Sequence, residues 1–138
     1  MNIEVRYLSK SGNTKKLADA IARELGITAK PITQAVPTNT DILFLGGAVY
    51  WGGINGELKD FIKTLGGKVK KTAVFSTAAI VPSAYPQMSK LIKAQHVTVL
   101  EKDFHCRGEF KKIHSGHPNS RDLQLAGEFA REVVQERS

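Results

Sequence analysis

Residues 7–17 join a strand pattern directly to a helix pattern, and this junction constrains the fold more than any other feature of the sequence. Apolar residues alternate along residues 3–7, as in a half-buried strand, and recur at helical spacing along residues 17–25. Residues 9–14 must therefore turn a corner around Gly12. Such a turn directs unpaired backbone N–H groups and the positive end of the helix dipole at one point, where a phosphate is the natural occupant.

This turn carries more polar side chains than a capped helix needs, since one capping hydroxyl would suffice. The side chains around Gly12 are Ser9, Lys10, Ser11, Asn13 and Thr14. The turn has neither the G-x-x-x-x-G-K pattern of triphosphate loops nor the G-x-G-x-x-G pattern of dinucleotide folds. It resembles the phosphate loop of flavodoxins, in which two hydroxyl residues flanking any residue precede G-N-T. The resemblance implies that residues 9–14, the phosphate loop below, bind the 5′-phosphate of FMN. We expect the double change Ser11→Ala, Thr14→Ala to weaken FMN binding and to leave folding intact.

The rest of the chain alternates between strand and helix patterns. Strands are expected at residues 27–32, 42–45, 72–76 and 97–106, and helices at residues 58–65, 88–92 and 120–133. Gly26 suits a left-handed cap on the first helix, and Pro31 makes the second strand an edge strand. At 138 residues and 41% hydrophobic, the chain suits one domain, residues 1–138.

Alternating strands and helices imply a parallel sheet with right-handed crossovers and helices on both faces. Together with the flavodoxin resemblance, this pattern predicts an α/β fold: a doubly wound five-stranded parallel sheet in the order 2-1-3-4-5. Ligands of such sheets bind beyond the carboxyl ends of strands one and three, where the phosphate loop lies.

The third strand leads into G-G-A-V-Y-W-G-G-I-N-G-E-L at residues 46–58, a glycine-rich segment with two adjacent aromatic residues. The aromatic pair either plugs the core or stacks on a flat ligand ring, which would contribute about 0.5–1.5 kcal/mol beyond the area buried. The position opposite the phosphate loop favours ligand contact. The segment resembles the second flavin loop of flavodoxins, and the resemblance implies that FMN contacts Ala48, Val49, Tyr50, Trp51, Gly52 and Gly53.

The end of the fourth strand is similar to the third flavin loop of the same family. Its small residues let the backbone approach the pyrimidine edge of the flavin, and the implied contacts are Ser76, Thr77, Ala78 and Ala79. Tyr85 either covers the other face of the ring or extends the apolar stripe of the helix at residues 88–92. Three loops are therefore expected to converge at one edge of the sheet.

The remaining residues favour no other chemistry. Cys106 is the only cysteine, so no intrachain disulfide or C-x-x-C pair exists, and it is expected to pack at a strand end. His114 and His117 lack further ligands at metal-binding spacing. The lysines of residues 68–71 have no interleaved aromatics, so a solvated turn explains them better than nucleic-acid binding. No catalytic set is apparent. No apolar run is long enough to span a bilayer and no leader precedes the first strand, so we expect a cytoplasmic protein.

The leading functional hypothesis is an FMN-binding electron carrier that passes electrons from a reductase to an acceptor and cycles through flavin semiquinone and hydroquinone, the former stabilised by the Gly52 carbonyl. One alternative is an FMN-dependent oxidoreductase of the same superfamily acting on a quinone, a porphyrinogen or another small molecule. Another is an interaction domain without the cofactor.

The net charge is the reason for keeping both alternatives. The chain carries 20 Lys and Arg against 13 Asp and Glu, a formal charge of +7, whereas electron-carrier flavodoxins are typically acidic around the flavin. Such a balance favours acidic-faced redox partners. We expect the partner-facing cations to be Lys10, Arg107, Lys111 and Lys112, in a monomer or weak homodimer.

Overall fold

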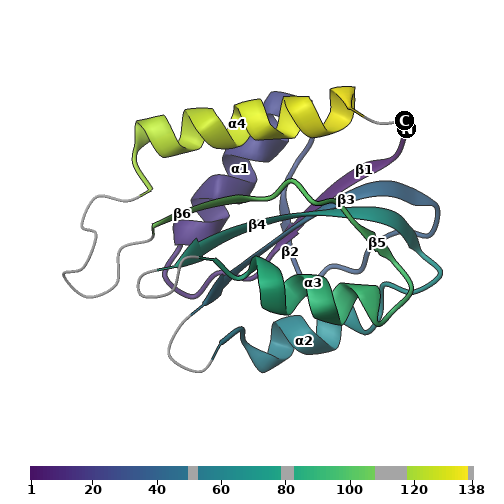
Figure 1. Cartoon of the computed structure of the whole chain (residues 1–138). Coiled ribbons are helices and arrows are strands. Elements are labelled where there is room, and N and C mark those ends of the chain that lie inside the picture. Colours follow the sequence, from purple (N-terminus) through teal and green to yellow (C-terminus); the bar gives the residue numbers. More distant parts are fainter. Residues whose placement is uncertain (50–52, 79–82, 108–117, 137–138) are drawn as a thin grey trace.

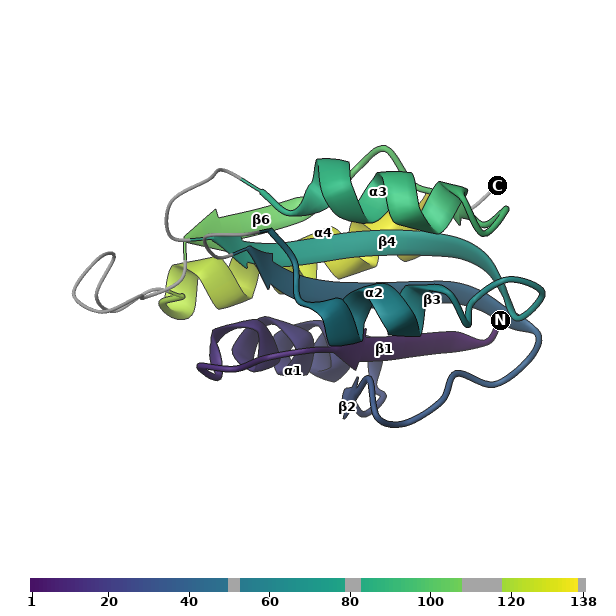
Figure 2. The same cartoon turned by 90° about the horizontal axis from the view of Figure 1, so that it is seen from below.

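The computed structural model of the chain describes residues 1–49, 53–78, 83–107 and 118–136. Its strands are β1 (Ile3–Tyr7), β2 (Lys30–Pro31), β3 (Thr40–Val49), β4 (Val69–Ala78), β5 (Thr98–Val99) and β6 (Phe104–Arg107), and its helices are α1 (Asn13–Leu25), α2 (Gly56–Ile62), α3 (Tyr85–Lys93) and α4 (Ser120–Gln135). One sheet forms the middle layer, with α1 and α4 on one face and α2 and α3 on the other (Figures 1 and 2). Among the described residues, no helix combines the length and the apolar character needed to cross a membrane.

The sheet confirms the predicted parallel order and adds one detail. Strands follow one another as β2-β1-β3-β4, and both β5 and β6 pair with the far edge of β4, all in parallel. The register sets Val99 beside Thr72 and Phe104 beside Phe75, so the edge chain has two more residues than β4 over this stretch. The hydrogen-bond ladder with β4 cannot continue through the two extra residues. The fifth strand is therefore split into two short strands.

Two apolar clusters fill the layers, because alternate residues of the central strand face opposite sides of the sheet. Leu43 and Leu45 pack under α2 and α3, whereas Ile42 and Phe44 pack under α1 and α4. The Phe44 ring meets Phe129 of α4 edge to face, with centroids 6.1 Å apart. The continuous apolar pattern of residues 42–45 is thus confirmed as a strand buried on both faces.

The helix ends follow the expected signals in two cases and differ in one. Gly26 ends α1 with φ 72°, and Asn119 begins α4 with a capping box closed by Asp122. α2, however, ends at Ile62, although Leu65 continues its apolar stripe and is fully buried. Both the amide and the hydroxyl of Thr64 donate to the Phe61 carbonyl, at 2.9 and 2.7 Å, which tightens the chain into a turn before Leu65.

A buried arginine was not expected from the strand pattern. Arg6 of β1 is 2% exposed. Its guanidinium donates to the carbonyls of Gln34 and Ala35, at 2.8 and 2.9 Å, and to the Glu4 carboxylate at 2.8 Å. The charge is therefore satisfied by the Glu4 carboxylate of the same strand and by carbonyls of the segment that follows β2.

Candidate functional site

The described parts of the three predicted loops meet at the carboxyl edge of β1, β3 and β4, as expected. The Leu8 amide donates to the Gly46 carbonyl at 3.1 Å, which joins the start of the phosphate loop to the third strand. A narrow cleft lined by residues of both loops, among them Lys10 and Ala48, separates them. α1 begins at this edge, so its N-terminal end faces the meeting point (Figures 1 and 2).

The start of α1, at the end of the phosphate loop, has features of an anion site. Gly12 precedes the helix with φ 91°, a left-handed conformation that other residues rarely adopt. Ser9 Oγ accepts the Gly12 amide at 3.0 Å and so shapes the loop. α1 has neither a side-chain cap nor an acidic residue in its first turn, whereas α2 and α4 have both. With the exposed Ser11 hydroxyl nearby, these groups fit a phosphate.

Thr14 is placed differently from the other hydroxyl residues of the loop. It is 1% exposed, and its Oγ1 lies 3.0 Å from Oγ1 of the buried Thr77 and 3.5 Å from the carbonyl oxygen of Gly47. These contacts tie the phosphate loop to the ends of β3 and β4. The hydroxyl of Thr14 therefore has a structural role, which the sequence motif did not indicate. The neighbouring Asn13 is also buried.

This contact changes the expected effect of removing the Thr14 hydroxyl. Thr14→Ala should lower the free energy of unfolding by about 1–2 kcal/mol, because the buried Thr77 hydroxyl loses its partner. Ser11→Ala, the exposed match in the same loop, should change it by less than about 0.5 kcal/mol. Urea unfolding of the cofactor-free proteins measures both. Equal stability of the two variants would show that the buried contact is unimportant, and the expectation that folding stays intact in the double variant would then stand.

The second loop continues β3 further than the glycine pattern suggested. Gly46 and Gly47 lie within the strand, which extends through Val49, and Ala48 is half-buried near its end. Residues 50–52 lie outside the described residues, so ligand contact by Tyr50, Trp51 and Gly52 stays a prediction. The described residues resume at Gly53, whose φ is 96°. The amide of Ile54 donates to the side chain of Gln87 at 3.1 Å.

Lys10 connects the first loop to the second across the site edge. Its Nζ lies 3.1 Å from the Glu57 carboxylate in the first turn of α2. Both side chains are more than half exposed, so this pair is worth little in stability. The pairing also means that Lys10 presents less net positive charge to a partner than the sequence suggested.

The small residues of the third loop face inward where they are described. Ser76 is fully buried, and its Oγ accepts the Ala84 amide at 3.3 Å. Thr77 is 3% exposed and contacts Thr14, as described above. β4 ends at Ala78, and Ala79 lies outside the described residues. Ligand contact by these four residues stays a prediction.

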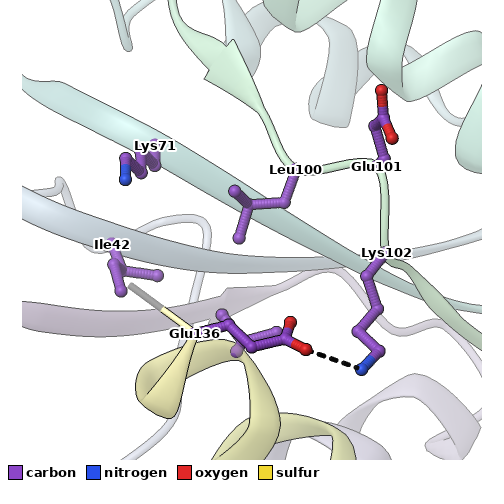
Figure 3. Close-up of a pocket in the computed structure, with 7 residues that line it drawn as sticks. Ile42, Lys71, Leu100, Glu101, Lys102 and Glu136 are labelled. Carbon is purple, nitrogen blue, oxygen red and sulfur yellow. Dashed lines mark ion pairs between the residues drawn. The ribbon is translucent and has the colours of Figure 1, made fainter. Parts of the chain in front are cut away.

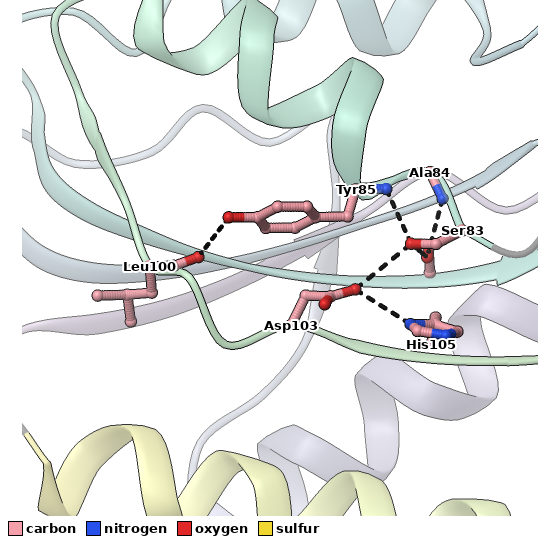
Figure 4. A network of polar contacts seen from close by, with 7 residues as sticks. Ser83, Ala84, Tyr85, Leu100, Asp103 and His105 are labelled. Atoms are coloured by element: carbon pink, nitrogen blue, oxygen red, sulfur yellow. Dashed lines mark hydrogen bonds and ion pairs between the residues drawn. The ribbon is translucent and has the colours of Figure 1, made fainter.

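Tyr85 packs as a residue of the third helix. Its hydroxyl donates to the Leu100 carbonyl at 2.9 Å, and its ring lies against the apolar cluster under α2 and α3 (Figure 4). These contacts favour the alternative in which Tyr85 extends the apolar stripe of the helix. Contact between Tyr85 and a bound flavin stays a prediction.

Sequence reasoning missed a polar network beside the third loop. The Asp103 carboxylate contacts Ser83 and His105, at 3.3 and 3.2 Å (Figure 4). Ser83 and Asp103 are far apart in sequence and come together only because β6 pairs with β4. No local pattern could have indicated this contact.

Cys106 is confirmed as a residue packed at a strand end, in β6 against the cluster under α1 and α4. Burial, and then the charge of Asp122, raises the pKa of Cys106 from 9.0 to about 12. At pH 8 a thiol reagent should therefore react about a thousandfold more slowly with the native protein than with the unfolded chain. Only the unfolded thiol ionises between pH 9 and 12, so this group also lowers stability as pH rises through that range. Similar rates in buffer and in urea would contradict this packing.

A larger cavity of about 400 Å³ lies at the opposite edge of the sheet (Figure 3). Ile42 and Leu100 line it, and Lys102 pairs there with Glu132 and with Glu136, the latter at 3.7 Å. It lies at the amino ends of the strands, away from the phosphate loop. The cavity is therefore no part of the candidate site.

The three-layered fold, with parallel strands in the order β2-β1-β3-β4 and helices on both faces (Figure 1), is that of a doubly wound α/β protein. A family model described as a flavodoxin domain matches residues 4–115. The chain therefore belongs to the flavodoxin family.

Comparisons with individual proteins agree with this assignment. Oxidised flavodoxin 1 from Bacillus cereus superposes with a TM-score of 0.73 and 22% identity, each chain covered in full. A flavodoxin from the domain Archaea gives 0.70 and 17%, covering 99% of this chain and 98% of that one. An uncharacterized protein of Methanocaldococcus jannaschii is 27% identical over 135 residues, which is 88% of this chain and 90% of that protein.

The same fold also occurs within a longer chain. Rubredoxin oxygen:oxidoreductase from Desulfovibrio gigas superposes with a TM-score of 0.73 and 13% identity over 97% of this chain but 35% of its own. At these identities the solved structures establish the fold alone.

Proposed function

We propose that this protein binds FMN at the carboxyl edge of β1, β3 and β4 and transfers electrons between a reductase and an acceptor protein. The observation that carries the proposal is the uncapped first turn of α1 behind Gly12, free of acidic residues. The family supports it, since the Bacillus cereus and archaeal structures compared above are named as flavodoxins.

In this proposal the phosphate loop supplies binding and orientation. The first-turn amides of α1 donate to the terminal phosphate, with Ser9 and Ser11 beside them. The contact between the Thr14 and Thr77 hydroxyls holds the loop against the end of β4. Bound FMN would supply the one- and two-electron chemistry, for which the described side chains offer no substitute.

The decisive experiment is a titration of cofactor-free protein with FMN, followed by absorption and fluorescence. We expect quenched flavin fluorescence and one FMN per chain. A protein that binds no flavin would instead be an interaction domain. A flavin-loaded protein that turns over a quinone or porphyrinogen without a second protein would be the oxidoreductase alternative.

The charge predicts how the proposed carrier meets its partners. With a formal charge of +7, the rate of electron transfer to an acidic-faced partner should fall severalfold between low and physiological ionic strength. Stopped-flow measurements over a salt series test this. Lys111 and Lys112, like the side chain of Arg107, lie outside the described residues, so their place on the rim stays a prediction. A rate that is flat or rises with salt would remove the acidic partner from the proposal.

A further inference from the structure

The polar network of Figure 4 joins the edge of the sheet to the start of α3, and the proposed function does not yet use it. Asp103 lies in the stretch between β5 and β6 that holds the surplus residues. Its Oδ2 accepts the Ser83 hydroxyl at 3.3 Å and lies 3.2 Å from Nδ1 of His105. Because an ionised carboxylate only accepts, Nδ1 of His105 carries a proton in this contact.

Two serine hydroxyls extend the network to β4. Ser83 Oγ accepts the Tyr85 amide at 2.9 Å, Ser76 Oγ accepts the Ala84 amide at 3.3 Å, and the two hydroxyls lie 3.5 Å apart. The Ser83 hydroxyl has one proton, which it donates in its hydrogen bond to Asp103. Ser76 is therefore the donor between the two hydroxyls. The carboxylate of Asp103 therefore sets the direction of the whole chain of hydrogen bonds.

The start of α3 depends on these contacts. Its N-cap residue, Ala84, has no side chain that can cap, and the first turn contains no acidic residue. Ser83 accepts the amide of Tyr85, the first residue of the helix, and Ser76 accepts the amide of the N-cap residue Ala84. The negative charge of Asp103 at this end of the helix adds a favourable interaction with the helix dipole.

The arrangement is not that of a nucleophilic serine. In a Ser-His-Asp triad the serine contacts the imidazole, which withdraws its proton. Here Ser83 contacts the carboxylate directly. The network therefore holds structure in place and does not activate a nucleophile.

We propose that Asp103 is a positioning residue for the FMN site, holding the start of α3 against the end of β4 through Ser83, with His105 supporting its carboxylate. This inference rests on the proposed function. The link to the site is short, because Ser76 is followed by Thr77, whose hydroxyl contacts Thr14 of the phosphate loop at 3.0 Å. A shift at the end of β4 is thereby transmitted to the residues that would bind the phosphate.

The first test needs no cofactor. In the full-length cofactor-free protein, Asp103→Ala should speed amide hydrogen exchange of Ala84 and Tyr85 about tenfold. Glu101→Ala, an exposed acid two residues away, is the matched control and should change neither amide. Unchanged exchange in Asp103→Ala would overturn the proposal. If Asp103→Ala does not fold, Ser83→Ala interrupts the same path. Its exchange rates at the same two amides then test the proposal in the same way.

The second test measures FMN affinity. Asp103→Ala and Ser83→Ala should each weaken FMN binding about tenfold, and the double variant should be no weaker than either, because both act along one path. Asp103→Asn keeps an acceptor for Ser83 and should recover affinity to within about threefold of wild type. Additive losses, or no recovery with Asn, would contradict positioning. Wild-type protein that fails to bind FMN would overturn the proposed function, whereas unchanged exchange overturns this inference, so the two failures are distinguishable.

Discussion

Riboflavin is expected to bind at least about a thousandfold more weakly than FMN. The two ligands differ only in the terminal phosphate, which the proposal places at the uncapped first turn of α1. Charge-assisted hydrogen bonds contribute about 1.5–3 kcal/mol each, so three of them exceed the roughly 4 kcal/mol that a thousandfold ratio requires even at the lower value. Parallel fluorescence titrations of the cofactor-free protein measure this ratio.

A pair of glycine variants tests whether the preference for FMN over riboflavin comes from the phosphate loop. Gly12 and Gly26 flank α1 with φ values of 91° and 72°, and no atom lies within 4 Å of a Cβ added at either. Because φ is positive at both positions, alanine should strain the backbone there by about 1–2 kcal/mol. Only Gly12→Ala should reduce the preference for FMN over riboflavin, because Gly26 lies at the far end of the helix. Equal ligand affinities in wild type, or an equal loss of preference in both variants, would remove the phosphate loop from the proposal.

Much of the fold could be predicted because its signals are local. The spacing of Leu17 and Ile21 and the cap at Gly26 define α1, and the apolar run at residues 42–45 identifies a strand covered on both faces. The position of the phosphate loop then follows from topology, since all carboxyl ends of a parallel sheet lie at one edge. These inferences needed no knowledge of which residues touch across the fold.

The rest depends on contacts between distant segments. The inward placement of Thr14 requires Thr77, which is 63 residues away. The division of the fifth strand reflects its register against β4, and the network at Asp103 reflects the pairing of β6 with β4. Hydroxyl residues in a loop look alike in sequence whether they face a ligand or the core. The sequence therefore indicated where the site lies better than which side chains line it.

Gly46→Ala is expected to cause the largest loss of stability, about 3 kcal/mol or more, equivalent to roughly 10 °C in melting temperature. Gly46 and Phe75 are register partners on β3 and β4, and a Cβ at Gly46 would lie 2.1 Å from the Phe75 ring. The ring is fully buried, so it has no free space to move into. Gly56→Ala is the control, since its Cβ would meet nothing within 4 Å and alanine favours the helix.

A second substitution separates this clash from other effects of the added methyl group. Phe75→Leu shortens the side chain that the new Cβ would strike, so the double variant should lose less stability than the two single losses combined. Urea unfolding of the four proteins gives this coupling. The effect should also reach the proposed site, because the Gly46 carbonyl accepts the Leu8 amide at the start of the phosphate loop. FMN affinity should therefore fall in Gly46→Ala and return with Phe75→Leu; strictly additive losses would show that the close packing of Gly46 on Phe75 does not hold the two strand ends in place.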